Sequence, residues 1–169
     1  KAIIGQHYLE VAWKESLKNN KLSKPWKSAD FYMIGELKIP KLKVSRVILN
    51  NVSGEAMAWS IGRVTKINHA LDKQPIILAG HRDSHMQFMS ELNVGDKIEL
   101  TMSDGLLKTY IISGTEVSNK PKISLSPDSL GRESLVLTTC WPFNAIKSGE
   151  HRYLVFAHYT SFNAYSNNI

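Results

Sequence analysis

Most of this chain consists of short runs in which apolar residues alternate with polar ones or follow one another without a break. A period of two is typical of a half-buried β-strand, and a short continuous apolar run is typical of a buried one. The runs are IGELKIP (34–40), LKVSRVIL (42–49), QPIILAGH (74–81), KIELTM (97–102), LLKTYIIS (106–113), SLVLTTC (134–140) and RYLVFAH (152–158). Seven or eight short strands predict a mostly antiparallel barrel or sandwich.

Two segments have a helical pattern instead. Apolar residues at four-residue steps in QHYLEVAWKESLKNN predict an amphipathic helix over 6–18. SGEAMAWSIG predicts a short helix with Ser53 as its N-cap and Gly62 as its stop. Between two alternating runs, Asp104-Gly105 predicts a tight hairpin.

The chain is long enough for one domain with a sizeable core and too short for two of ordinary size. It has 169 residues, 43% of them hydrophobic and 21% charged, as in ordinary globular proteins. We expect residues 1–30 to form the N-terminal helix and a connector, and residues 31–169 to form the β domain. The single cysteine excludes an internal disulfide, and no apolar run reaches the roughly 18 residues that span a bilayer.

The net charge of +6 is concentrated in the first third of the chain. Residues 1–50 contain ten Lys and Arg against four Asp and Glu, whereas residues 51–169 contain eleven of each. We find no basic stripe with interleaved aromatic residues, so we expect no nucleic-acid partner. The basic segment fits either proximity to an anionic membrane surface or a solvated lysine-rich helix face.

Cys140 lies where a predicted strand ends, because Trp141-Pro142 interrupts the β-ladder. A lone cysteine is commonly a buried packing residue. At the edge of a sheet, however, a thiol is accessible to a substrate. The position therefore favours a nucleophile.

A cysteine nucleophile needs a partner that transfers protons. His81 is the best candidate because it ends the most apolar strand, directly after Gly80, while His85 and His151 are alternatives. Arg152 begins the last strand, and its permanent charge suits the stabilisation of an oxyanion.

Two other interpretations stay open on the residues alone. His81, Asp83 and His85 alternate, so on an extended segment they would share one face, which is an arrangement that suits the ligands of a metal-dependent hydrolase. His151 or Asp96 would have to complete that set. The second alternative is a catalytically silent barrel that binds extended peptides.

Three segments together resemble the sortases: LAGHRDS around His81, LVLTTCWPF around Cys140 and HRYLVFA around Arg152. Sortases typically have a Gly-His strand end, a Thr-Leu-x-Thr-Cys motif and a strand-borne arginine, in that order. IGELKIPKLKV and LNVGDKIEL are also similar to sortase segments, so the resemblance covers about 34–157. HRDS and TTCWPF most resemble class D-like sortases and the group found in Gram-negative bacteria, and the preceding Trp-containing helix favours the latter.

Two features depart from the sortase pattern. Val136 replaces the first Thr of the motif, although Leu137, Thr139 and Cys140 match it. Strand alternation puts Val136 on the same face as Cys140, so we expect altered packing and an unchanged catalytic group. The usual Gly- and Pro-rich passage before the histidine strand is replaced by SIGRVTKINHALDKQP (60–75).

The resemblance implies a closed eight-stranded β-barrel and a cysteine transpeptidase that cleaves a C-terminal LPXTG-like sorting signal, without metal or cofactor. Cys140 would form a thioacyl enzyme, His81 would transfer protons, and Arg152 would stabilise the oxyanion or position the peptide. The loop 118–133 would bind the apolar residues of the sorting signal. Three further side chains are expected to line the groove: Thr139, Trp141 and His85.

The implied partners are substrate proteins with a C-terminal sorting signal and an amine acceptor, which is an envelope component or a protein. Sortases act on the outer side of the bacterial cytoplasmic membrane, usually through an N-terminal membrane helix. We therefore expect an anchoring segment before Lys1, and the basic first third near the bilayer. The helix 6–18 would pack on the barrel and set its distance from the membrane.

Overall fold

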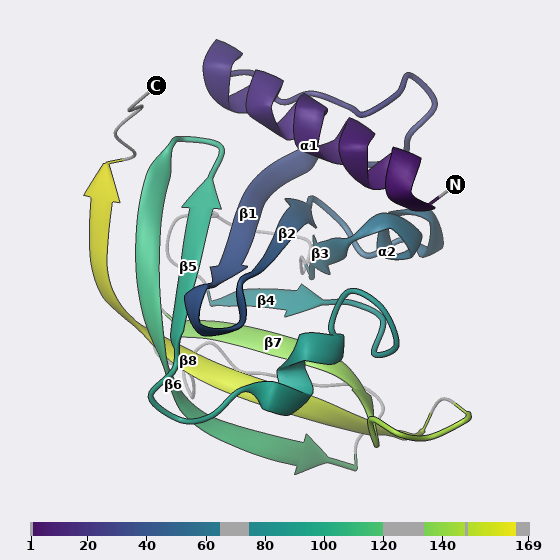
Figure 1. Cartoon of the computed structure of the whole chain (residues 1–169), viewed down its shortest axis with the longest axis vertical. Coiled ribbons are helices and arrows are strands. Elements are labelled where there is room, and N and C mark those ends of the chain that lie inside the picture. Colours follow the sequence, from purple (N-terminus) through teal and green to yellow (C-terminus); the bar gives the residue numbers. More distant parts are fainter. Residues whose placement is uncertain (1, 65–74, 120–133, 148, 165–169) are drawn as a thin grey trace.

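The computed structural model of the chain describes residues 2–64, 75–119, 134–147 and 149–164 (Figure 1). Nearly all of the expected recognition loop 118–133 lies outside these ranges, as does most of the passage 60–75. The described residues form a β-barrel with a long helix packed on its outside.

Within the described residues, eight strands close into a barrel in the order β1-β2-β3-β4-β7-β8-β6-β5. The pairs β2–β3 and β4–β7 are parallel, and the other pairs are antiparallel. The strands are β1 (Met33–Ile39), β2 (Val44–Leu49), β3 (Ile61–Arg63), β4 (Ile76–Ala79), β5 (Lys97–Met102), β6 (Leu106–Ser118), β7 (Ser134–Trp141) and β8 (His151–Ala164). This confirms the expected closed eight-stranded barrel.

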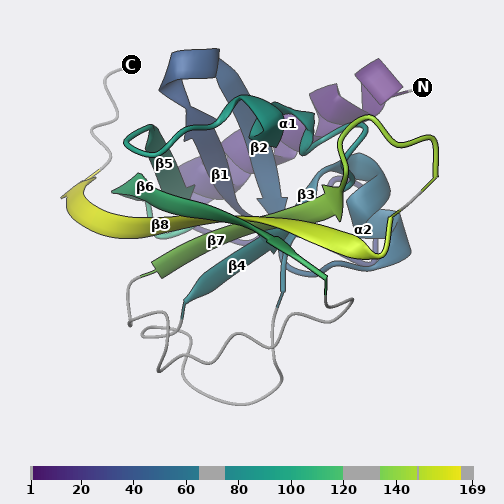
Figure 2. The same ribbon diagram turned by 90° about the horizontal axis from the view of Figure 1, so that it is seen from below.

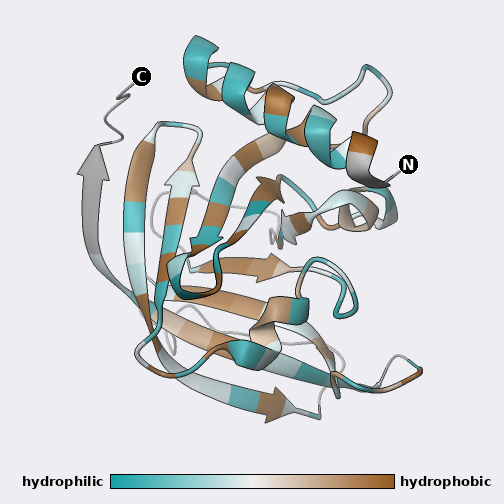
Figure 3. Cartoon of the chain, in the orientation of Figure 1, coloured by the Kyte–Doolittle hydropathy of each residue, from teal (hydrophilic) through white to brown (hydrophobic). Residues whose placement is uncertain are grey.

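The long helix α1 (Ala2–Asn19) lies against the outer face of the barrel, beside β1 and β2 (Figure 1). Leu9 and Trp13 are buried in a cluster that also contains Phe31 and Met33. Figure 3 shows hydrophilic colours over much of the rest of α1. The helix is therefore amphipathic, as its sequence predicts, and it shares a core with the barrel wall.

The shorter helical elements also follow their sequence signals. Ser53 caps α2 (Gly54–Trp59), because its side-chain oxygen accepts a hydrogen bond from the Ala56 amide. The remaining described helices are the 3₁₀ turns η1 (Pro40–Leu42) and η3 (Gln87–Glu91), the second of which lies in HMQFMSEL. In the hairpin between β5 and β6, Gly105 has the positive φ of 78° that glycine adopts readily.

The prediction that the second helix stops at Gly62 is wrong. The helix ends before Ser60, whose backbone is extended, and Ile61–Arg63 form strand β3. A Cβ added to Gly62 would lie 2.0 Å from the carbonyl oxygen of Asn51. Gly62 is thus required for the close approach of β3 to the segment that follows β2. A three-residue strand is too short to produce a periodic signal.

An apolar cluster fills the barrel interior, and every second residue in parts of β7 and β8 belongs to it. Leu135 and Leu137 come from β7, and Val155 and Ala157 come from β8. Figure 3 shows the hydrophobic colours along β4 and β7. Because side chains alternate along a strand, Cys140 lies on the outer face of the barrel wall.

Candidate active site

Three adjacent strands, shown side by side in Figure 2, direct the candidate catalytic residues to one edge of the barrel. β7 and β8 are antiparallel, and Cys140 is directly opposite Arg152. β4 is parallel to β7, with Ala79 paired to Thr138. His81 comes two residues after Ala79, and Cys140 comes two residues after Thr138. The register therefore brings His81 and Cys140 to the same edge of the sheet as Arg152.

A buried hydrogen bond continues the pairing beyond the end of β4. The Thr139 hydroxyl donates to the Gly80 carbonyl oxygen at 2.8 Å, and Thr139 is only 3% exposed. Gly80 is so closely packed that an added Cβ would lie 2.8 Å from Met86. The residues just before His81 and Cys140 are therefore held together. Contact between Thr139 and a substrate stays a prediction, and its burial favours a positioning role.

The candidate nucleophile and its partner are both accessible. Cys140 is half-buried and has a free thiol, while His81 is exposed. Thr138 lies on the same face of β7 as Cys140, and its buried hydroxyl has no hydrogen-bond partner among the described residues. Sequence analysis did not single out Thr138, whose buried hydroxyl lies two residues before Cys140.

Arg152 keeps its charge available to a ligand. Its Nη1 donates to the carbonyl oxygens of Gly149, at 3.2 Å, and His151, at 3.1 Å. In the described part of the chain, no carboxylate lies within ion-pair distance of its guanidinium. A half-buried arginine bonded only to neutral carbonyls can attract a developing oxyanion or a peptide carboxylate.

Trp141 is opposite His151 at the end of the β7–β8 pair, and their rings are 6.0 Å apart and tilted by 67°. Strand alternation places Trp141 on the face of β7 that does not carry Cys140. The structure therefore does not bring these two neighbouring side chains to one face, and a contact between Trp141 and the substrate stays a prediction.

His85 lies against α2 beyond the histidine turn. Its Nε2 is 3.2 Å from the carbonyl oxygen of Ala58, and its own carbonyl oxygen accepts a hydrogen bond from Arg46. Burial lowers the pKa of His85, and the charges of Arg46 and His81 add to the effect, against the hydrogen bond to Ala58. Lining of the groove by His85 stays a prediction.

The metal-site alternative receives no support from this geometry. The Asp83 carboxylate accepts two hydrogen bonds from Arg82, at 2.7 and 2.9 Å. These bonds lower the pKa of Asp83, and the charges of Arg82 and His81 lower it further. Nowhere in the described ranges do three His, Cys, Asp or Glu residues lie together as metal ligands would.

Sequence analysis also missed Arg82, which is 6% exposed although it lies between the exposed His81 and Asp83. Apart from Asp83, its partners are backbone carbonyls about 60 residues further along the chain. No local pattern identifies such partners. The only signal was an arginine beside the candidate histidine in HRDS.

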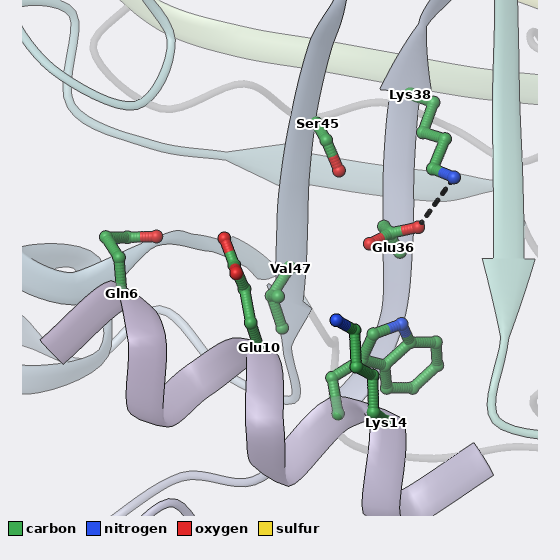
Figure 4. A pocket seen from close by; sticks show the side chains of 8 residues that line it. Gln6, Glu10, Lys14, Glu36, Lys38, Ser45 and Val47 are labelled. Carbon is green, nitrogen blue, oxygen red and sulfur yellow. Dashed lines mark ion pairs between the residues drawn. The ribbon is translucent and has the colours of Figure 1, made fainter. Parts of the chain in front are cut away.

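A cavity of about 300 Å³ lies between α1 and the outer face of β1 and β2 (Figure 4). In it Lys38 and Glu36 form an ion pair at 3.4 Å. The lining residues are Gln6, Glu10, Trp13, Lys14, Glu36, Lys38, Ser45 and Val47. None of them comes from β4, β7 or β8, so this cavity is separate from the candidate active site.

This chain, a closed barrel with Cys140 opposite Arg152 at one edge, belongs to the sortase family. Residues 37–160 match the family model of the sortase domain. Sortase D of Bacillus subtilis (strain 168) is 30% identical over 122 residues, which cover 72% of this chain and 61% of that protein. The chain therefore spans less than two thirds of that relative. The likeness to class D-like sortases is confirmed, and the Gram-negative grouping stays a prediction.

Solved sortase structures have the same fold. Sortase E from Streptomyces avermitilis superposes with a TM-score of 0.63 at 25% identity, covering 81% of this chain and 93% of that one. Sortase A from Listeria monocytogenes superposes with a TM-score of 0.66 at 15% identity, covering 80% and 92%. None of the helices in the described residues has the length and apolar character needed to cross a membrane.

Proposed function

We propose that this protein is a cysteine transpeptidase that cleaves a C-terminal LPXTG-like sorting signal and joins the new carboxyl end to an amine. The observation that carries the proposal is the pairing of Cys140 with Arg152, beside the strand that leads to His81. Acyl transfer through a thioester needs a thiol nucleophile, a proton-transfer group and a stabiliser for the oxyanion. Membership of the sortase family supports the same reaction.

In the first half-reaction, the Cys140 thiolate attacks the scissile carbonyl carbon. The carbonyl oxygen becomes negative in the tetrahedral intermediate, and the Arg152 guanidinium stabilises it or holds the peptide in place. The C–N bond then breaks, and the leaving amine takes a proton from the His81 imidazolium. The result is a thioacyl enzyme with a neutral His81.

In the second half-reaction, the acceptor amine attacks the thioester carbonyl and gives a proton to His81. The C–S bond breaks, and Cys140 leaves as a thiolate. The cycle restores thiolate and imidazolium, and it needs neither metal nor cofactor. Because the nucleophile is regenerated, one enzyme molecule transfers many substrates.

The proposed partners are substrate proteins that carry the sorting signal and an amine acceptor on the cell envelope. The proposed location is the outer side of the bacterial cytoplasmic membrane, with the anchor in a segment that precedes Lys1. Residues 1–30 would then be the membrane-proximal part, and residues 31–169 the catalytic domain. The excess of lysine in the first 50 residues supports this orientation, because anionic lipids attract basic segments.

The proposal is tested by incubating the protein with LPXTG-like peptides and a primary amine, followed by mass spectrometry of the products. We expect the unmodified protein to form the amine-linked product and Cys140→Ala to form none. Equal peptide binding by both proteins without any product would favour the silent barrel. Cleavage that survives Cys140→Ala and is lost with a chelator would favour the metal-dependent hydrolase.

A further inference from the structure

All five N–H groups of the buried Arg82 guanidinium have an acceptor. Nε and Nη2 donate to the two carboxylate oxygens of Asp83, at 2.7 and 2.9 Å. Nη1 donates to the carbonyl oxygens of Pro142, at 2.8 Å, and Lys147, at 3.5 Å, and Nη2 also donates to that of Ala145, at 2.9 Å. A buried charge is tolerated only when it is paired and hydrogen-bonded in this way.

The three carbonyl acceptors belong to one loop, the connection between β7 and β8. This loop follows Cys140 on β7 and leads to Arg152 on β8. Its other end is also tied to the strands, because Gly149 accepts a hydrogen bond from Arg152. A Cβ added to Gly149 would lie 2.1 Å from the Trp141 carbonyl oxygen. The path of this loop therefore depends on contacts at both of its ends.

Arg82 itself belongs to the opposite side of the site, where it directly follows His81. The chain before His81 is already tied to β7 by the bond from Thr139 to Gly80. Arg82 adds a second connection, from the residue after His81 to the loop after Cys140. These two connections lie on either side of His81 in the chain. They fix the backbone of His81 relative to Cys140.

We propose that Arg82 is a positioning residue that sets the position of His81 relative to Cys140 and Arg152 by fastening the histidine turn to the β7–β8 loop. The proposal rests on the transpeptidase function proposed above. Arg82 acts through the backbone and does not touch the substrate, because its five donors are already used. Asp83 orients the guanidinium from the solvent side, because the Asp83 side chain is 72% exposed.

Lysine cannot replace this arginine. Its ammonium presents three donors from one point and cannot reach Asp83 and the loop carbonyls at once. We expect Arg82→Met and Arg82→Lys to lower kcat by at least about 10-fold, because small misplacements of catalytic groups are costly. KM should stay within about 2-fold, since binding of the peptide is retained. Asp83→Asn keeps the shape of the side chain and should give a smaller loss of kcat.

The test combines kinetics with hydrogen exchange of the loop amides. In Arg82→Met and Arg82→Lys, exchange of the Ala145 amide, which donates to the Pro142 carbonyl oxygen, should accelerate while exchange in the barrel core stays slow. Lys24→Met is the matched control, because Lys24 donates to the Ala29 carbonyl oxygen at 2.7 Å, in a segment that contributes nothing to the site. It should change neither kcat nor exchange of the loop.

The outcomes separate the two proposals. Faster loop exchange with an unchanged kcat would overturn the positioning role and leave the transpeptidase function intact. Unchanged loop exchange in both Arg82 variants would overturn the role as well. If the unmodified protein forms no product, the transpeptidase function fails, whereas the exchange experiment still shows whether Arg82 holds the loop. If Arg82→Met does not fold, Arg82→Lys and Asp83→Asn supply the same comparison.

Discussion

Cys140 and Arg152 are directly paired across the antiparallel strands β7 and β8. Facing residues of an antiparallel pair lie on the same side of the sheet, with Cβ atoms about 4.5–5.5 Å apart. Backbone register therefore places these two residues on one side of the sheet, and their placement does not depend on a flexible loop. His81, which follows strand β4, lies at the same edge because β4 is parallel to β7.

The role proposed for Arg152 predicts a loss confined to the chemical step. Arg152→Met should lower kcat by about 10²- to 10³-fold, as expected when a donor to an oxyanion is removed. Steady-state kinetics with a sorting peptide measures it. Arg152→Lys keeps the charge but not the fork of donors and should recover only part of the rate. A large rise in KM with an unchanged kcat would instead assign Arg152 to peptide binding.

Thr139 is predicted to support the site from inside the barrel wall. Thr139→Val keeps the shape but leaves the buried carbonyl oxygen of Gly80 without its donor. The free energy of unfolding should fall by about 2 kcal/mol, and kcat should fall with it because the His81 turn loosens. Urea unfolding and kinetics measure the two effects. Thr139→Ser retains the hydroxyl and serves as the control, and equal losses in both variants would argue against the hydrogen bond.

His85 should make the fold less stable in mild acid. Burial lowers its pKa, so the folded protein favours the neutral ring and the unfolded chain binds the proton more readily. Its contribution to stability is therefore complete above the unfolded pKa of about 6.5 and is lost as the pH falls below it toward the lower folded pKa. Urea unfolding from pH 7.5 to 5.5 should show a smaller loss of stability in His85→Gln than in the unmodified protein. Equal slopes would contradict this.

The helix α1 should contribute to the stability of the barrel. Leu9 is completely buried, so Leu9→Ala should reduce the free energy of unfolding by about 2–5 kcal/mol. Val11 lies on the same helix but is 40% exposed, and Val11→Ala should have little effect. A single unfolding transition in both variants is expected because α1 shares its core with β1. A separate early transition for α1 would show that the helix folds independently.

The strands with clear alternation could be predicted from the sequence, and so could the capped start of α2. Strand β3 could not, since its three residues leave no period and Gly62 resembles a helix stop. The parallel pairing of β4 with β7 joins segments far apart in the chain, and no local pattern encodes it. Residue type and hydrophobic period thus predicted the elements, while long-range pairing determined the barrel.

Residue type and position relative to the strands were sufficient to predict the three candidate catalytic residues. Cys140 and Arg152 lie at strand ends and His81 lies two residues beyond one, close to the positions that the sequence indicates. Arg82 was missed because its partners in the β7–β8 loop are backbone atoms, which have no signature in the sequence. Thr139 and Trp141, which the resemblance placed along the groove, alternate with Cys140 in β7, and their contact with a substrate stays a prediction.

The most direct test of the account is the intact mass of the protein after brief incubation with an LPXTG-like peptide in the absence of an amine acceptor. We predict an increase equal to the acyl part of the peptide, located on Cys140 by peptide mapping and removed when an amine is added. His81→Gln should reduce the yield of the adduct. Peptide cleavage that leaves Cys140 unmodified, or an adduct on another residue, would contradict the account.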